Sequence, residues 1–261
     1  MRKSLGAVLL GAALALAGCA GEGGTSPPPA GSSASTVTGN VTVFAAASLT
    51  ESFTQIGRDF EAANPGSKVT FSFLGSSALA TQINQGAPAD VFASAAPANM
   101  TTVTGAGNAD GTPTTFARNQ LVIAVPKGNP KAISGLADLT KPGVKVALCA
   151  EQVPCGAAAR NALDAASVKL TPVTLETDVK AALSKVKLGE VDAALVYRTD
   201  TKAASSDVDG VEFPESAGAI NDYPIVVLKD APHKVAAKAF VEYVLSAKGK
   251  AVLAQAGFQA P

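Results

Sequence analysis

Residues 41–60 read VTVFAAASLTESFTQIGRDF, and this stretch decides the fold prediction. An apolar run typical of a buried strand ends at a short turn of small residues and leads directly into a helix. Ser48 stands where the helix begins, and Glu51 follows three residues later, in the spacing of a capping box. The first turn of a helix carries unpaired N–H groups and a partial positive charge. The Ser48 hydroxyl is therefore expected either to cap the helix or to face an anion held there.

The same alternation of strand and helix continues along the chain, which predicts an α/β fold with mostly parallel sheets. The expected strands are 41–45, 68–73, 91–93, 121–125, 144–148, 193–196 and 225–228. The expected helices are 49–63, 77–85, 97–105, 156–165, 179–188 and 233–246, with a shorter helical turn at 136–139.

Two of the strands, 121–125 and 223–228, are candidates for crossings between two lobes. A chain that crosses out and returns builds one lobe from both of its ends and the other lobe from its middle. We expect lobe 1 at about 40–117 with 222–261, and lobe 2 at about 118–221. Two lobes joined by two extended segments enclose a cleft that can close by a hinge motion.

The N-terminus has the features of an export signal, and we leave it out of the fold. Arg2 and Lys3 precede an apolar stretch that is too short for a comfortable transmembrane helix. The sequence Leu16-Ala17-Gly18-Cys19 looks like a bacterial lipobox, in which the cysteine is acylated. We therefore expect a signal peptide at 1–18, a lipid on Cys19, a flexible tether at 19–39, and a domain anchored to the outer face of the cytoplasmic membrane. The alternative is a plain secretory signal in which Cys19 is incidental.

Composition and charge exclude some classes of function. The 261 residues are 47% hydrophobic, which is ample for a core. The 21 basic and 21 acidic residues balance, and removal of Arg2 and Lys3 leaves 19 against 21, a net charge of −2. No basic run supports nucleic-acid binding. Export permits a disulfide between Cys149 and Cys155, which the sequence leaves open. A metal site is disfavoured, because the single histidine, His233, is distant and no CxxC exists.

Five strand-to-helix junctions could hold a ligand, because ligands of open α/β sheets bind at the carboxyl ends of strands. Each has an ordinary explanation, since a serine is commonly an N-cap and a tyrosine is commonly part of the core. Together they offer hydroxyls and amides without an obligatory cation, which suits a tetrahedral oxyanion. The residues concerned are Ser48, Ser76 or Ser77 after Gly75, Cys155, Val179 and Tyr197.

Four segments of the sequence resemble the periplasmic molybdate-binding proteins of ABC transporters. They are VFAAASL (43–49), GSSALATQI (75–83), GAPADVFASA (86–95) and ALVYRTD (194–200), and the resemblance spans about 40–260. It implies the two-lobed type II periplasmic-binding-protein fold and no enzymatic activity. It also implies a monomer without a cofactor that captures molybdate or tungstate and delivers the oxyanion to the permease of the transporter.

The resemblance also implies which residues bind the oxyanion. Ser48 would donate through both its hydroxyl and its backbone N–H. Ser76 and Tyr197 would donate through hydroxyls, with Ser77 as the alternative to Ser76, and Cys155 and Val179 would donate through backbone N–H groups. The chain departs from the family pattern at Cys155, where alanine is common, and at Arg198, where glycine is frequent. Arg198 is expected either to face solvent or to strengthen general anion attraction.

Rival functions have weaker support in the sequence. Ser184 and Lys187 form an SxxK match without its companion motifs, and no GxSxG elbow exists, so a serine hydrolase is disfavoured. The stronger rival is a solute-binding protein of the same fold for sulfate, phosphate or an organic acid, and a structural adhesion module is the third alternative. The five expected donors include no carboxylate, which disfavours protonated phosphate, whereas sulfate would be distinguished by its smaller size.

Overall fold

The computed structural model describes residues 37–261. The expected signal peptide, Cys19 and nearly all of the expected tether lie outside these described residues. Between residues 37 and 261, no helix is both long and apolar enough to cross a membrane.

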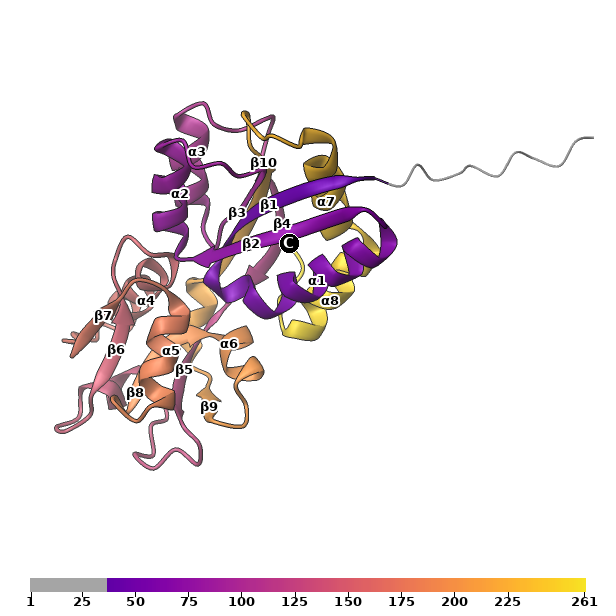
Figure 1. Ribbon diagram of the computed structural model, residues 1–261. Coiled ribbons are helices and arrows are strands. Elements are labelled where there is room, and N and C mark those ends of the chain that lie inside the picture. The colour runs from indigo at the N-terminus through magenta and orange to yellow at the C-terminus, as the bar shows by residue number, and fades with distance from the viewer. Residues whose placement is uncertain (1–36) are drawn as a thin grey trace, which may run out of the picture. The chain divides into compact units, whose positions relative to one another are not determined.

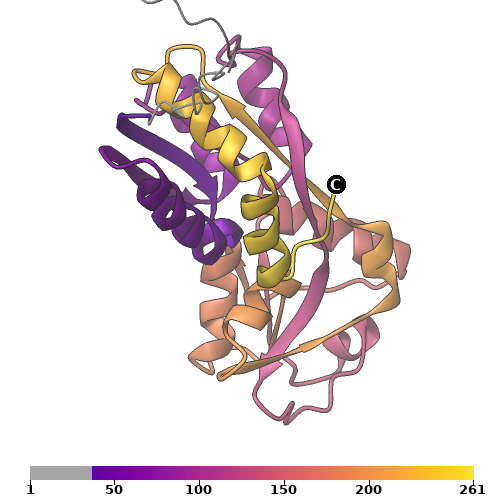
Figure 2. The ribbon, with the colours of Figure 1, turned by 90° about the vertical axis from the view of Figure 1, so that its right-hand side faces the viewer.

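The described chain forms two five-stranded sheets, each with its own helices (Figures 1 and 2). We call the first sheet with its helices lobe 1 and the second sheet with its helices lobe 2. In lobe 1 the strand order is β2 (Ser67–Leu74), β1 (Gly39–Ala46), β3 (Val91–Ala93), β10 (Asn221–Val227) and β4 (Thr114–Asn119). In lobe 2 it is β7 (Thr174–Glu176), β6 (Val146–Cys149), β8 (Ala193–Tyr197), β5 (Leu121–Pro126) and β9 (Val208–Val211).

Helices cover both faces of the lobe 1 sheet because the side chains of β1 alternate between the faces. Val41 and Val43 are buried in one cluster with α1 (Thr50–Ala63), α7 (Lys234–Leu245) and α8 (Ala247–Ala256). Phe44 is buried in another cluster with α2 (Ser76–Asn84) and α3 (Pro97–Gly105). Phe53, Phe60 and Phe240 add edge-to-face aromatic pairs to the first cluster.

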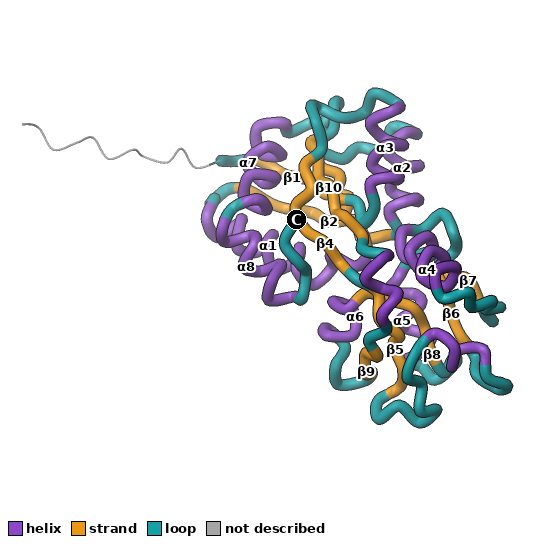
Figure 3. The backbone as a smooth tube through the Cα atoms, turned by 180° about the vertical axis from the view of Figure 1, so that it is seen from behind, coloured by secondary structure: helices purple, strands orange, loops and turns teal. Residues whose placement is uncertain are grey.

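Lobe 2 has a single core formed by its sheet and surrounding helices. The helices are α4 (Pro154–Ala165), α5 (Val179–Lys187) and α6 (Arg198–Ala203), with short 3-10 turns at Leu136–Thr140 and Pro214–Gly218. The tube in Figure 3 shows β4 running into β5, which carries the chain from one lobe to the other. Only Gln120 separates these two strands. The chain returns from β9 to β10 through the 3-10 turn at Pro214–Gly218.

The two-lobed α/β fold expected from the sequence is confirmed, and its sheets are mixed. In each sheet two neighbouring pairs are parallel and two are antiparallel. The antiparallel pairs all involve β5 or β10. Strand β5 brings the chain from lobe 1 into lobe 2, and β10 brings it back into lobe 1. Each therefore runs in the direction opposite to its neighbours in the sheet.

The expected elements are present with their ends shifted by no more than four residues, and three further strands and two further α-helices were missed. Strand β4 has a largely polar sequence, TTFARN, whereas β7 and β9 are only three and four residues long. Helix α6 is a short turn directly after a strand. Helix α8 follows α7 with one residue between them, Ser246, whose hydroxyl accepts from Gly249 N. Short or polar segments carry little periodicity, which explains these omissions.

Candidate functional site

The strand-to-helix junctions of both lobes meet around one small cavity. Its volume is about 10 Å³, enough for about one water. It is lined by Ala46, Ala47, Ser48, Gly75, Ser76, Ala95, Val153, Pro154, Cys155, Asp178, Val179 and Tyr197. All five residues expected from the sequence line this cavity, whereas Ser77 lines a neighbouring groove with Gln152 and Thr177. The structure therefore brings the five together and favours Ser76 over Ser77.

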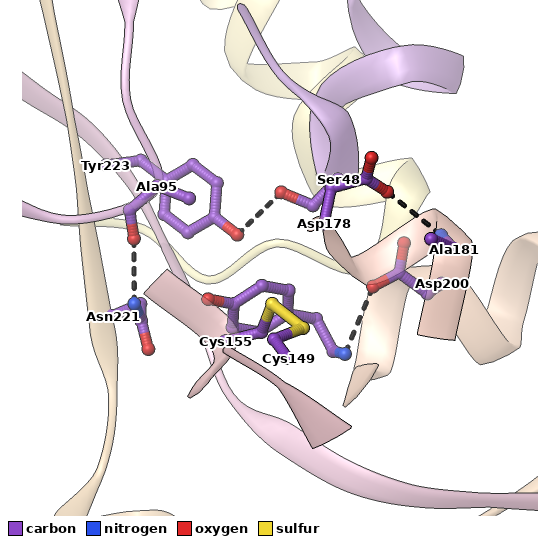
Figure 4. The surroundings of a disulfide bond; sticks show 10 residues. Ser48, Ala95, Cys149, Cys155, Asp178, Ala181, Asp200, Asn221 and Tyr223 are labelled. Atoms are coloured by element: carbon purple, nitrogen blue, oxygen red, sulfur yellow. Dashed lines mark hydrogen bonds between the residues drawn. A yellow bond between two sulfur atoms is a disulfide. The ribbon is translucent and has the colours of Figure 1, made fainter. Parts of the chain in front are cut away.

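Ser48 does not cap α1, so the first of its two expected roles, the helix cap, is wrong. A 3-10 turn, Ala47–Leu49, precedes the helix, the N-cap is Leu49, and no side chain in the described region caps that end. The Ser48 hydroxyl instead lies 2.8 Å from the hydroxyl of Tyr223 on β10, and both side chains are buried (Figure 4). The ordinary explanation of this serine therefore does not hold.

Tyr223 and Asn119 form a buried hydrogen-bonded group behind Ser48. The side-chain amide of Asn119 donates to the Tyr223 hydroxyl at 3.5 Å, and either hydroxyl of the Ser48–Tyr223 pair can be the donor. When Tyr223 donates, Ser48 has its own proton free for an acceptor in the cavity. Burial raises the pKa of Tyr223 well above its ordinary value, so the Tyr223 hydroxyl keeps its proton at neutral pH.

Ser76 is the first residue of α2, and its N-cap is Gly75. Its Oγ accepts a hydrogen bond from Ala95 N at 3.0 Å, which leaves the hydroxyl proton available. Gly75 allows lobe 2 to approach, because a Cβ at this position would lie 2.3 Å from the carbonyl oxygen of Thr177. The expectation that Gly75 permits close backbone approach is therefore confirmed.

Cys155 is the second residue of α4, which begins at Pro154. Proline suits the first position of a helix, where its missing N–H would have no partner. Cys155 forms a disulfide with Cys149 at the end of β6, with a Cα–Cα distance of 5.7 Å (Figure 4). The loop closed by this disulfide is short, and chain entropy gives it a stabilisation of about 2 kcal/mol. The disulfide ties the first turn of α4, and with it the Cys155 N–H, to the end of a strand.

Val179 opens α5, and the residue before it introduces a carboxylate that the sequence reasoning did not include. Asp178 is the N-cap, and its Oδ1 accepts from Ala181 N at 2.9 Å (Figure 4). Asp178 also lines the cavity. The lining is therefore not free of carboxylates, although part of this charge is engaged by the helix end.

Tyr197 lines the cavity, and its hydroxyl is buried without a partner among the described residues. The residue is 1% exposed, and its Oη has no hydrogen-bond partner among residues 37–261. Burial, together with the nearby Tyr223 and Asp200, raises the pKa of Tyr197 well above its ordinary value. A buried hydroxyl without a partner is costly, so it points to a ligand that accepts a hydrogen bond here.

Arg198, one of the two residues that depart from the family pattern, forms its ion pair outside the cavity. Its guanidinium donates from Nε and Nη2 to the two carboxylate oxygens of Glu212, both at 2.8 Å. Glu212 also raises the pKa of Arg198. Arg198 does not line the cavity, which favours the interpretation that it faces solvent.

The cavity is suited to an anion with several acceptor atoms. The N-terminal ends of α2, α4 and α5 converge on it, and each supplies N–H groups and a partial positive charge. Three hydroxyls, those of Ser48, Ser76 and Tyr197, join them. Within the described part of the chain, no group of three or more His, Cys, Asp or Glu side chains could hold a metal ion.

Sequence reasoning missed the residues that support the donors. Tyr223 and Asn119 lie at the two crossings between the lobes. The predicted crossings near 121 and 223 were therefore the sequence feature that could have pointed to these two residues. Asp178 had a local signal as well, because an acidic residue before an apolar helical run is a typical N-cap.

Comparison with known proteins identifies the family. Residues 41–259 match the model of the bacterial extracellular solute-binding proteins. The chain belongs to this family. It is therefore an extracytoplasmic binding protein rather than an enzyme.

Individual relatives agree with this assignment. The solute-binding chain is 47% identical over 249 residues to the Molybdate-binding protein ModA of Mycobacterium bovis, covering 95% of each protein. Two solved structures share its fold. The periplasmic molybdate-binding protein of Azotobacter vinelandii is 22% identical, with a TM-score of 0.72, over 85% of this chain and 99% of that one. The sulfate-binding protein SubI of Mycobacterium tuberculosis is 20% identical, with a TM-score of 0.73, over 85% of this chain and 86% of that one.

Proposed function

We propose that this solute-binding protein captures molybdate in the cavity between its lobes. One observation carries the proposal: Tyr197 lines the cavity, and its buried hydroxyl has no partner among the described residues. Ser48, Ser76 and Tyr197 donate through hydroxyls, and Cys155 and Val179 donate through N–H groups. The relative that is 47% identical over nearly the whole chain is named for molybdate binding, which supports this choice of oxyanion.

Selectivity for molybdate follows from the size of the anion. Sulfate is also a tetrahedral dianion but is smaller, so some of its hydrogen bonds in the same set of donors would be lengthened or lost. A hydrogen bond to a charged group contributes about 1.5–3 kcal/mol, and the loss of one is enough to discriminate. Tungstate is nearly the same size as molybdate and is expected to bind as well. Sulfate is the alternative ligand, and a sulfate-binding protein shares the fold alone at 20% identity.

The cavity fits only about one water in this structure, so an oxyanion requires the lobes to move slightly apart. We infer that the lobes, at about 40–117 with 222–261 and about 118–221, open and close about the two crossings. The closed, loaded monomer then delivers molybdate to the permease of an ABC transporter. A lipid on Cys19 would hold the protein at the outer face of the cytoplasmic membrane.

Thermal unfolding in the presence of oxyanions tests the function. A ligand that binds only the folded protein stabilises it by about 2.7 kcal/mol at a hundred times its Kd. Molybdate and tungstate are expected to raise Tm strongly, whereas equal concentrations of sulfate and phosphate are expected to raise it little. A larger shift with sulfate than with molybdate would favour the alternative. The absence of any shift with all four anions would contradict both.

A further inference from the structure

Lys180 connects the two lobes close to the cavity. It lies on α5 of lobe 2, and its Nζ is 2.8 Å from each carboxylate oxygen of Glu51, on α1 of lobe 1. The same Nζ lies 3.0 Å from Oδ1 of Asp200, within lobe 2. One ammonium group therefore bridges a carboxylate of each lobe.

The two ion pairs of Lys180 differ in burial. The Asp200 side chain is fully buried, whereas the Glu51 side chain is 52% exposed. Burial alone would lower the pKa of Lys180, but the charges of Asp200 and Glu51 outweigh this effect and raise it. A buried carboxylate deprived of its partner is strongly destabilising, so Asp200 keeps Lys180 in place. The exposed pair with Glu51 is the one that can break when the lobes separate.

Asp200 extends this connection to the cavity. Its Oδ2 accepts a hydrogen bond from Tyr197 N at 3.0 Å, which fixes the backbone of the residue with the unpaired hydroxyl. Lys180 also directly follows Val179, another cavity residue. The chain of contacts Glu51–Lys180–Asp200–Tyr197 therefore runs from the lobe interface to the cavity. Glu51, Lys180 and Asp200 do not themselves line the cavity.

We propose that Lys180 is a latch between the lobes that slows molybdate release, and that Asp200 is a positioning residue which couples the latch to Tyr197. The proposal rests on molybdate being the ligand. In the closed molecule Lys180 forms ion pairs with both Glu51 and Asp200. When the lobes open, the ion pair with Glu51 breaks and water hydrates the Glu51 carboxylate. The Glu51 pair therefore adds to the barrier that a bound oxyanion must overcome to leave.

The variant Glu51→Gln tests the latch, because it removes the contact with lobe 1 and keeps the buried Lys180–Asp200 pair. Release is measured by loading the protein with radioactive molybdate and chasing with an excess of unlabelled molybdate. We expect release to be about threefold to fivefold faster than in the wild type, as for loss of a partly exposed ion pair. Glu190→Gln is the matched control. Glu190 forms an ion pair at 2.6 Å with Lys185, which is on α5 like Lys180, but this ion pair lies entirely within lobe 2. The control variant should release molybdate at the wild-type rate.

A double-mutant cycle tests the coupling to Tyr197. If Asp200 couples the Glu51–Lys180 ion pair to the Tyr197 hydroxyl, the two substitutions should not act independently. Glu51→Gln should then accelerate molybdate release less than twofold in a Tyr197→Phe background. An equal acceleration in both backgrounds would overturn the positioning role. Circular dichroism of each variant verifies that it is folded.

The outcomes separate the latch from the proposed function. If the wild-type protein binds molybdate and Glu51→Gln releases it at the wild-type rate, the latch is overturned while the function stands. If the wild-type protein retains no molybdate, the proposed function is contradicted, and the role of Lys180 in molybdate release is overturned with it.

Discussion

The hydroxyls of Ser48 and Tyr223 lie 2.8 Å apart, although 175 residues separate the two positions in the chain. Ser48 follows the first strand of lobe 1, and Tyr223 lies on β10, the strand that returns from lobe 2. Asn119, at the end of the strand that leaves lobe 1, donates to the same Tyr223 hydroxyl. Both crossings between the lobes therefore support one donor of the cavity.

Removal of the Tyr223 hydroxyl should weaken oxyanion binding although this residue does not line the cavity. In Tyr223→Phe, the Ser48 hydroxyl loses its buried hydrogen-bond partner, and we expect the Kd for molybdate to rise roughly tenfold, as for one lost hydrogen bond. Calorimetric titration measures the change. Tyr243→Phe, on α7 and away from the cavity, is the control that should leave the Kd unchanged. An unaltered Kd in Tyr223→Phe would contradict this role of the hydrogen bond.

Tyr197→Phe should separate affinity from stability. The hydroxyl has no partner among the described residues, so its loss should leave the free energy of unfolding unchanged or slightly higher. The same loss should weaken molybdate binding by about 1.5–3 kcal/mol, roughly tenfold or more. Urea unfolding without ligand and calorimetry with ligand measure the two effects. Reduced stability with unchanged affinity would show that the hydroxyl is structural.

Gly75→Ala should hold the lobes apart. The added Cβ would lie 2.3 Å from the carbonyl oxygen of Thr177, closer than real contacts allow. We therefore expect the variant to close less far than the wild type when no ligand is bound, so small-angle scattering without molybdate should show a larger molecule. Gly105→Ala at the end of α3 is the control, because nothing lies within 4 Å of a Cβ there. Equal sizes of Gly75→Ala and the wild type without ligand would argue against closure at this contact.

Alkaline pH should destabilise the protein through its buried tyrosines. Burial raises the pKa of Tyr197 and of Tyr223 above the unfolded value of about 10. Their contribution to stability is fully present below that value, and it is lost as the pH rises from about 10 toward the folded pKa. Ultraviolet absorbance of phenolate should therefore show these two tyrosines ionising only above the ordinary range or with unfolding. Ionisation of all three tyrosines near pH 10 in the folded protein would contradict their burial.

The fold could be predicted because its main elements are long and apolar. The strand and helix at 41–60 have the expected form, and the order of alternation gave the α/β class. The direction of β5 and β10 could not be predicted, because it depends on which lobe each strand enters. The roles of Ser48 and Tyr223 were hidden for a similar reason, since local spacing indicates a helix cap whereas the actual partner comes from the far end of the chain.

The GAPAD motif at 86–90 was recognised in the sequence, but the physical role of its aspartate was not. Asp90 is fully buried, and its carboxylate accepts from Thr42 N at 2.7 Å and from His233 N at 2.8 Å. It therefore joins β1 to the start of α7 rather than contacting the cavity. Such a structural use of a motif residue depends on tertiary contacts that spacing alone does not indicate.

The central claim is that molybdate binds among Ser48, Ser76, Cys155, Val179 and Tyr197. The most direct test is a crystal grown with molybdate and measured at the molybdenum absorption edge. One strong anomalous peak should lie in the cavity, with the three hydroxyls and two N–H groups within hydrogen-bond distance of its oxygens. A peak outside this cavity, or none from a protein that retains molybdate in solution, would contradict the site.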